Sequence, residues 1–271
     1  MIQLIFFIIM GMIQGLTEPL PISSSGHITI FKQIINVPYF NNLDYLVILN
    51  FASFLAIFII YYREIKTLTI NIYQHLFSKD KQAVSQENFN FFILLIISSI
   101  PTFISALLLK KIIDKSLTNI NILIISFFIT AIFLLIASFK NGKDRIKDIS
   151  KMKALLIGIF QSIALFPGIS RSGMVLSSLM LLNIKKEDSI KYTFFLYFPI
   201  SIASFLLEIF NFLKNPLPSY LLILYSISFI VTFLCTWLAY NYLVKIVHNN
   251  KLWYFSIYCI LLSVFLIIYY H

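Results

Sequence analysis

The ten residues EPLPISSSGH, at positions 18 to 27, combine side chains that carry out acid–base and nucleophilic chemistry. Glu18 and His27 can exchange protons, and the hydroxyl of Ser24 becomes a nucleophile when a base assists it. If a helix starts at the serines, His27 lies on the same face as Ser24 and within reach of its hydroxyl. Gln14, four residues before Glu18, would share a helix face with it. This spacing predicts an assisted nucleophile next to a carboxylate.

A second stretch, PGISRSG at positions 167 to 173, contributes a permanent positive charge. Arg171 cannot lose its proton in a protein, and a charge at membrane depth costs at least about 2.5 kcal/mol on insertion scales. It therefore needs a partner or a ligand. Small residues let backbone N–H groups converge, and a helix that begins after them adds its positive end, so the stretch favours a phosphate.

Each of these residues also has a structural interpretation. Glu18 and Arg171 can form an ion pair that serves only to stabilise the bundle. The serines at 23 to 25 and 170 to 172 are typical helix N-cap residues, and most of them are expected to cap. His27 can be a core histidine whose nitrogens are satisfied by neighbours.

The composition is that of an integral membrane protein. The chain has 271 residues, of which 59% are hydrophobic and 12% charged, and its mean hydropathy is +0.90. Several apolar runs reach about 20 residues, the length that crosses a bilayer. The net charge of +10 is interpreted as the cytoplasmic excess of Lys and Arg, and no nucleic acid partner is expected. Cys235 and Cys259 lie in apolar runs without metal-ligand spacing.

The elements that must position these residues form an all-α, polytopic membrane helical bundle. We expect six transmembrane helices, at residues 44–62, 91–109, 119–139, 192–213, 219–240 and 252–270. Two further apolar regions, 2–36 and 153–184, are broken by Pro, Gly and Ser, and each predicts a re-entrant helix hairpin. A membrane tolerates such a break only where the tip is buried in protein or lines a watery cavity.

The two hairpins are copies of each other. A shift of 147 residues aligns GMIQGLTEPLPISSSG (11–26) with GIFQSIALFPGISRSG (158–173). Three spans follow each copy, so the second copy enters the membrane from the opposite side. We therefore predict one membrane domain, 1–271, made of inverted repeats at 1–139 and 153–271, with the site between them near the midplane.

The charges predict an orientation. On this scheme fifteen of the 21 Lys and Arg residues lie on one side and five on the other, with Arg171 within the membrane. The side with fifteen is expected to be cytoplasmic. Both termini then lie outside, and the first hairpin opens outward.

At these residues the chain resembles the bacterial undecaprenyl-diphosphate phosphatase family, the integral membrane bacitracin-resistance type. QGLTEPLPISSSGH matches the family's (E/Q)xxxE and PxSSxGH elements, and PGISRSG matches its PGxSRSG box. Length and motif order agree over essentially the whole chain. The resemblance implies hydrolysis of a C55 polyprenyl diphosphate to its monophosphate and inorganic phosphate, in the bacterial cytoplasmic membrane. The product is the lipid carrier of cell-envelope glycan synthesis.

The resemblance also assigns roles residue by residue. Ser24 would be the nucleophile, assisted by His27 and Glu18, although His27 as nucleophile stays open. Arg171 would hold the diphosphate. Substrate-binding groups are expected at Gln14, Ser23, Ser25, Gly26, Ser170, Ser172 and Gly173. Family members are assisted by a divalent metal, so the resemblance implies Mg or Ca near Glu18. A homodimer is compatible with the sequence.

Three positions depart from the family pattern. The second box usually continues with Ala-Thr, where this chain has Met174 and Val175, and the first box usually has Phe in place of Pro19. None of the proposed catalytic groups is lost, but a hydroxyl near the phosphate is.

Two other functions share some of these features. Lipid phosphatases that carry SGH and SR need a second histidine after the Arg, and residues 172 to 247 contain none. A transporter or flippase of polyprenyl phosphate or a small anion would use the same inverted repeats. Transport alone does not require a Ser, His and Glu in one repeat opposite an Arg in the other.

Overall fold

The fold is all-helical throughout the residues that the structure describes. The computed structural model describes residues 2–35, 43–77, 83–116, 119–214 and 219–270. The ends of the predicted domain, residues 1 and 271, and residue 36 of the first hairpin lie outside these ranges. The α-helices are α1 (Ile2–Thr17), α2 (Ser24–Ile35), α3 (Leu43–Ile60), α4 (Tyr62–Phe77), α5 (Ala83–Ser116), α6 (Ile120–Ser138), α7 (Lys151–Ile163), α8 (Arg171–Leu181), α9 (Lys186–Lys214), α10 (Ser219–His248) and α11 (Trp253–Tyr270), with a short 3-10 helix η2 (Ile146–Asp148).

Four of these helices, α5, α6, α10 and α11, are each long and apolar enough to cross a membrane, and α3 with α4 would make a fifth span. Their outer faces are covered with apolar side chains: Leu108 and Ile268 are both more than 75% exposed. Such a surface is stable only against lipid. The chain is therefore a multi-pass helical membrane protein.

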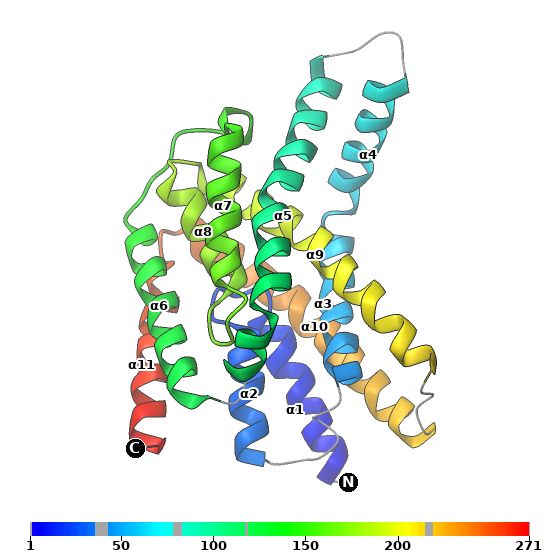
Figure 1. Ribbon diagram of the computed structural model, residues 1–271, viewed down its shortest axis with the longest axis vertical. Coiled ribbons are helices and arrows are strands. Elements are labelled where there is room, and N and C mark those ends of the chain that lie inside the picture. Colours follow the sequence, from blue (N-terminus) through cyan, green and yellow to red (C-terminus); the bar gives the residue numbers. More distant parts are fainter. Residues whose placement is uncertain (1, 36–42, 78–82, 117–118, 215–218, 271) are drawn as a thin grey trace.

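α4 was not predicted. It is amphipathic, carries Arg63, Glu64 and Lys66 near its start, and departs from α3 at an angle of 75°. With the first part of α5 it projects beyond the rest of the bundle (Figure 1). The charges end the apolar run of α3 at residue 61 while helix formation continues, so the apolar pattern alone missed the helix.

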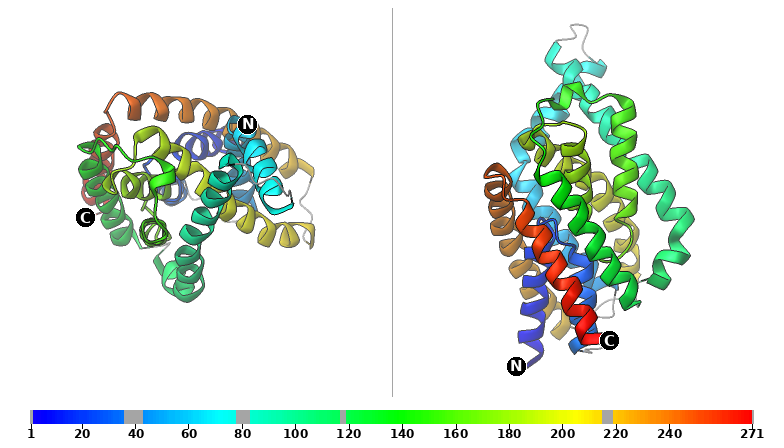
Figure 2. Two further views of the ribbon diagram at one scale, coloured as in Figure 1. Left: turned by 90° about the horizontal axis from the view of Figure 1, so that it is seen from above. Right: turned by 90° about the vertical axis from the view of Figure 1, so that its left-hand side faces the viewer.

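Two helical hairpins approach each other along the long axis of the molecule. α1 and α2 occupy one half, α7 and α8 the other, and the turns that join each pair lie near the middle (Figures 1 and 2). Both described chain ends lie at the α1 and α2 end (Figure 2).

α1 is held by α10 through side chains that bind its backbone. Ser228 Oγ donates to the carbonyl of Phe7 at 2.7 Å, and Thr232 Oγ1 donates to the carbonyl of Gly11 at 3.0 Å. Tyr45 OH donates to Ser228 Oγ at 2.9 Å. Hydroxyl-to-carbonyl bonds between helices are favourable where water cannot compete.

α7 is held by α5 in the same manner. Ser98 Oγ donates to the carbonyl of Ala154 at 2.8 Å, and Thr102 Oγ1 to that of Gly158 at 3.3 Å. The hydroxyls of Tyr192 and Ser98 are 2.7 Å apart. Ala154, Gly158 and Tyr192 are each 147 residues after Phe7, Gly11 and Tyr45, so the two contacts are equivalent.

Gly15 sets how closely α1 approaches α10. A Cβ there would lie 2.5 Å from the carbonyl oxygen of Thr232 and 2.6 Å from Cβ of Cys235, neither of which can move without its helix. With Gly11 it forms a GxxxG pair that suits close helix contacts in membranes.

Gly15→Ala is expected to destabilise the protein by about 1–3 kcal/mol, because the helices must separate, and this exceeds the roughly 1 kcal/mol that Ala adds to helix propensity. The measurement is the thermal unfolding temperature in detergent. Leu16→Ala, at a 39% exposed position on the same helix, is the control and should change it little. An unchanged unfolding temperature for Gly15→Ala would contradict the close packing.

Candidate active site

The turns of the two hairpins touch. Ser172 Oγ, at the start of α8, donates to the carbonyl of Leu20 in the first turn at 3.2 Å. A Cβ on Gly26 would lie 2.9 Å from Cα of Gly168. Residues about 150 positions apart in sequence are thereby brought into one site, as the repeats predicted.

Each turn ends in a serine that caps the next helix. Ser23 Oγ accepts from the backbone N–H of Gly26 at 3.3 Å, and Ser170 Oγ accepts from that of Gly173 at 3.1 Å. These are the N-cap bonds expected of serines in these positions. The hydroxyls of Ser23 and Ser170 thus cap their own helices. Ser24 is the first residue of α2, and its hydroxyl donates to Glu18 instead.

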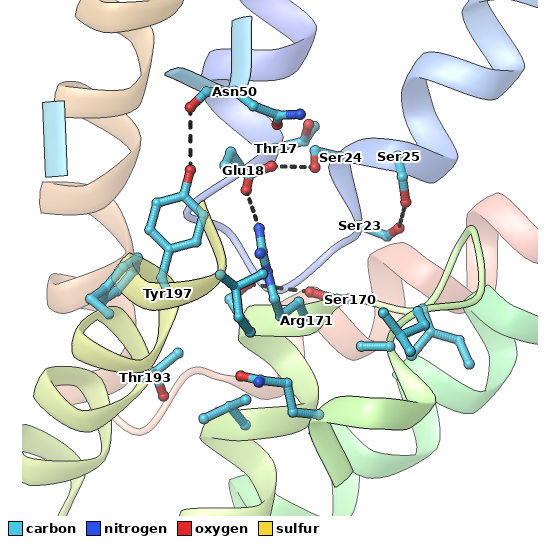
Figure 3. A pocket seen from close by; sticks show the side chains of 18 of the residues that line it. Thr17, Glu18, Ser23, Ser24, Ser25, Asn50, Ser170, Arg171, Thr193 and Tyr197 are labelled. Atoms are coloured by element: carbon cyan, nitrogen blue, oxygen red, sulfur yellow. Dashed lines mark hydrogen bonds and ion pairs between the residues drawn. The ribbon is translucent and has the colours of Figure 1, made fainter. Parts of the chain in front are cut away.

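Glu18 links the two hairpins. Its Oε1 lies 2.7 Å from Nη2 of Arg171, which is the first residue of α8 (Figure 3). Its Oε2 accepts from Nε2 of Gln14 at 3.1 Å and from the hydroxyl of Ser24. The Glu18 side chain is only 5% exposed. The expected ion pair is present, and the carboxylate also contacts the predicted nucleophile.

Two further residues belong to the site and were not predicted. The guanidinium of Arg171 lies over the ring of Tyr197, 4.6 Å from its centroid. Asn50 accepts from Gln14 at 2.8 Å through Oδ1, and its backbone carbonyl accepts from Tyr197 OH at 3.4 Å. Tyr197 is 147 residues after Asn50, so the repeat shift could have paired them.

These side chains line a cavity of about 310 Å³. Its polar wall is formed by both hairpins, together with Asn50, Tyr197 and Thr193 (Figure 3). The rest of the wall is mainly apolar and includes Ile57, Leu165, Ile169, Val175, Phe194 and Ile200. A polar end next to an apolar wall suits an amphiphile with a charged head. Val175, where the family pattern has a hydroxyl, is one of the apolar lining residues.

Most predicted binding residues reach this cavity. Ser23, Ser25, Ser170 and Ser172 line it. Gln14 is not a lining residue, but its side-chain amide donates to Glu18 and Asn50, which are. Gly26 and Gly173 are instead the backbone donors to the two capping serines.

His27 is not brought to Ser24. Its Nδ1 lies 2.7 Å from the carbonyl oxygen of Ser23, and its Nε2 lies 2.7 Å from the hydroxyl of Tyr258 on α11. It is absent from the residues that line the cavity. His27 and Ser24 lie on one helix, but the side chain of His27 turns back toward the turn and toward α11, so the predicted contact with the nucleophile does not form.

The side chains around Glu18 determine what kind of divalent-cation site the protein can offer. Among the described residues no three His, Cys, Asp or Glu side chains converge. Glu18 provides one carboxylate, and Mg²⁺ is commonly held by one or two carboxylates together with substrate phosphates. The residues therefore fit a cation that binds with a phosphorylated substrate.

Comparison with known proteins identifies the family of this chain. The family model described as bacitracin resistance protein BacA matches residues 7–265. A Bacillus thuringiensis protein named undecaprenyl-diphosphatase 2 is 36% identical, over 97% of this chain and 96% of its own length. Undecaprenyl-diphosphatases of Oceanobacillus iheyensis and Thermosipho africanus are 32% and 37% identical, over 98% and 95% of this chain and 96% of their own lengths. With two hairpins that meet at a Glu, a Ser and an Arg, this chain belongs to the bacitracin resistance protein BacA family.

Proposed function

We propose that this chain is a phosphatase that hydrolyses undecaprenyl diphosphate to undecaprenyl phosphate and inorganic phosphate. The reaction recycles a lipid carrier for cell-envelope glycan synthesis and confers bacitracin resistance. Full-length relatives are named for this activity, and the family for the resistance. The observation that carries the proposal is the contact of Glu18 with both Ser24 and Arg171 at one cavity with an apolar wall.

The cavity supplies an anion site before any substrate binds. α2 begins at Ser24 and α8 begins at Arg171, so the positive ends of two helices face the same space from opposite hairpins. In the mechanism Arg171 exchanges Glu18 for the terminal phosphate, which accepts two N–H donors from the guanidinium. Tyr197 keeps the guanidinium plane in place during the exchange.

The released carboxylate can then act as a base. Glu18 Oε2 already accepts the hydroxyl proton of Ser24. As Ser24 Oγ attacks the terminal phosphorus, the proton passes to Glu18 and the bond to the bridging oxygen breaks, so undecaprenyl phosphate leaves. Water then attacks the phosphoserine, and as the phosphorus–oxygen bond to Ser24 breaks, the proton held by Glu18 returns to Ser24 Oγ, which gives inorganic phosphate and restores both residues. Positioning and charge stabilisation provide most of the catalysis in such a transfer.

A divalent cation fits this site when it binds with the diphosphate. Glu18 would hold it, and the cation would supply charge neutralisation between the phosphates. The protein's own residues provide the nucleophile, the proton acceptor and the permanent cation.

We also propose that the bundle consists of six spans and two re-entrant hairpins in two inverted repeats, 1–139 and 153–271. The equivalent contacts of α1 with α10 and of α7 with α5 support it, because residues related by 147 positions accept matching bonds. α9 would be the sixth span.

The charge distribution supports an orientation in the bacterial cytoplasmic membrane. Fifteen basic residues would face the cytoplasm, both termini would lie outside, and the site would open outward. The two chain ends lie together at the α1 and α2 end of the molecule, which is consistent with this proposal (Figure 2).

Ser24→Ala is expected to lower phosphate release from undecaprenyl diphosphate by about a thousandfold, because no hydroxyl remains to attack. Thr29→Ala, which removes a hydroxyl of α2 that donates to the carbonyl of Ser25, is the control and should release phosphate normally. Acid-quenched wild-type protein should carry phosphate on Ser24 by mass spectrometry. Phosphate trapped on His27 would overturn the serine mechanism.

Arg171→Lys is expected to lower phosphate release by about a hundredfold, because a lysine keeps the charge but not the fork of donors. The measurement is the steady-state rate in detergent. A rate equal to that of the wild type would mean that charge alone suffices.

Chelation is expected to lower the rate as well. EDTA should suppress phosphate release, and added Mg²⁺ or Ca²⁺ should restore it, because the cation binds with the diphosphate at Glu18. An EDTA-resistant rate would show that the reaction needs no cation.

A further inference from the structure

The two hairpins turn at different residues. In the second turn the backbone reaches the left-handed region at Gly168, with φ of 90°, where no Cβ opposes it. In the first turn it does so at Ser23, with φ of 69°. Residues other than glycine rarely adopt that backbone conformation, and a serine keeps it only where the surrounding structure holds it.

The repeat shift explains the difference. The position equivalent to Gly168 is occupied by Pro21, whose ring fixes φ near −65° and prevents a left-handed turn there. Ser170, the equivalent of Ser23, keeps an ordinary φ of −77°. The turn of the first hairpin is thus displaced by two residues, to the position directly before Ser24.

His27 binds the displaced turn. Its Nδ1 must carry a proton, because the carbonyl of Ser23 can only accept, and the two atoms are 2.7 Å apart. In a neutral ring Nε2 then accepts, and Tyr258 OH is the donor at 2.7 Å. Both ring nitrogens are therefore occupied, and no lone pair is free to assist Ser24.

The ring of His27 also contacts one aromatic ring of α11 and one of α6. Tyr258 of α11 stacks on it, with ring centroids 5.6 Å apart, and Phe127 of α6 meets it edge-on at 5.4 Å. The second hairpin has Met174 at the equivalent position, next to a turn that needs no such support. A histidine occurs only in the copy whose turn is displaced.

We propose that Tyr258 and His27 are positioning residues that hold the left-handed turn at Ser23 and thereby aim the hydroxyl of Ser24 at the substrate. The inference rests on the proposed phosphatase function, and it assigns His27 no part in proton transfer. Tyr258 fixes the tautomer and plane of the ring, and the ring fixes the carbonyl of Ser23.

Two amides that resemble different halves of the imidazole test the proposal. Asn places its N–H where Nδ1 lies and can still donate to the carbonyl of Ser23, whereas Gln reaches toward Nε2. His27→Asn keeps the bond to Ser23 but not the bond to Tyr258, so it is expected to lose about tenfold in kcat, as Tyr258→Phe does, while His27→Gln and His27→Ala lose about a hundredfold, as misplaced nucleophiles do. A general base or nucleophile would be lost equally in all three, and an inactive but folded His27→Asn would overturn the proposal.

Tyr258→Phe isolates the second contact. It should lower kcat by about tenfold and leave KM unchanged, because the nucleophile is misaimed while the phosphate site is intact. Tyr269→Phe, the same change at an exposed position of α11, is the matched control and should match the wild type. A wild-type kcat for Tyr258→Phe would remove Tyr258 from the proposal.

Phosphate release from undecaprenyl diphosphate and unfolding temperature in detergent are measured for every variant. Wild-type protein that folds but releases no phosphate would refute the proposed function itself. Phosphate release by the wild type that is lost in Arg171→Ala establishes the assay. The difference in kcat between His27→Asn and His27→Gln then tests the positioning role separately from the proposed function.

Discussion

The structure depends on one ion pair, between Glu18 and Arg171. A charge buried in an apolar bundle is costly without a partner, and neither hairpin contains both charges. The pair therefore joins the two hairpins at their turns and makes the site inseparable from the fold. A phosphate offers the guanidinium the same two-oxygen partner as a carboxylate, so in the proposed mechanism the contact that stabilises the protein without substrate is also the one that substrate replaces.

The hairpins are supported crosswise. α1 of the first hairpin is bound by α10, which follows the second hairpin in the sequence, and α7 of the second hairpin is bound by α5, which follows the first. In each contact a serine and a threonine donate to helix carbonyls, and a tyrosine hydroxyl contacts the serine. Each hairpin is thus held by a helix that follows the other hairpin in the sequence, and such contacts cover irregular backbone with protein, as a membrane requires.

Much of the site could be predicted from the sequence, because an arginine, a glutamate and a serine cluster in apolar hairpins carry strong signals. Glu18, Ser24 and Arg171 meet as expected. The partners of His27 could not be predicted, since Tyr258 lies 231 positions away and helical spacing places Ser24 on the same face. Asn50 and Tyr197 were missed because an amide and a phenol in spans are usually packing residues. The helix α4 was missed because its charges interrupt the apolar period that marked α3.

The size of the cavity has a consequence for how substrate is selected. About 310 Å³ accommodates a diphosphate and the first part of an isoprenoid, so nearly all of a C55 tail must remain among the acyl chains of the bilayer. The tail is then solvated by lipid in both the free and the bound state, and its length adds little to affinity. Recognition falls on the head group, and substrate supply is governed by two-dimensional diffusion and by carrier density in the leaflet.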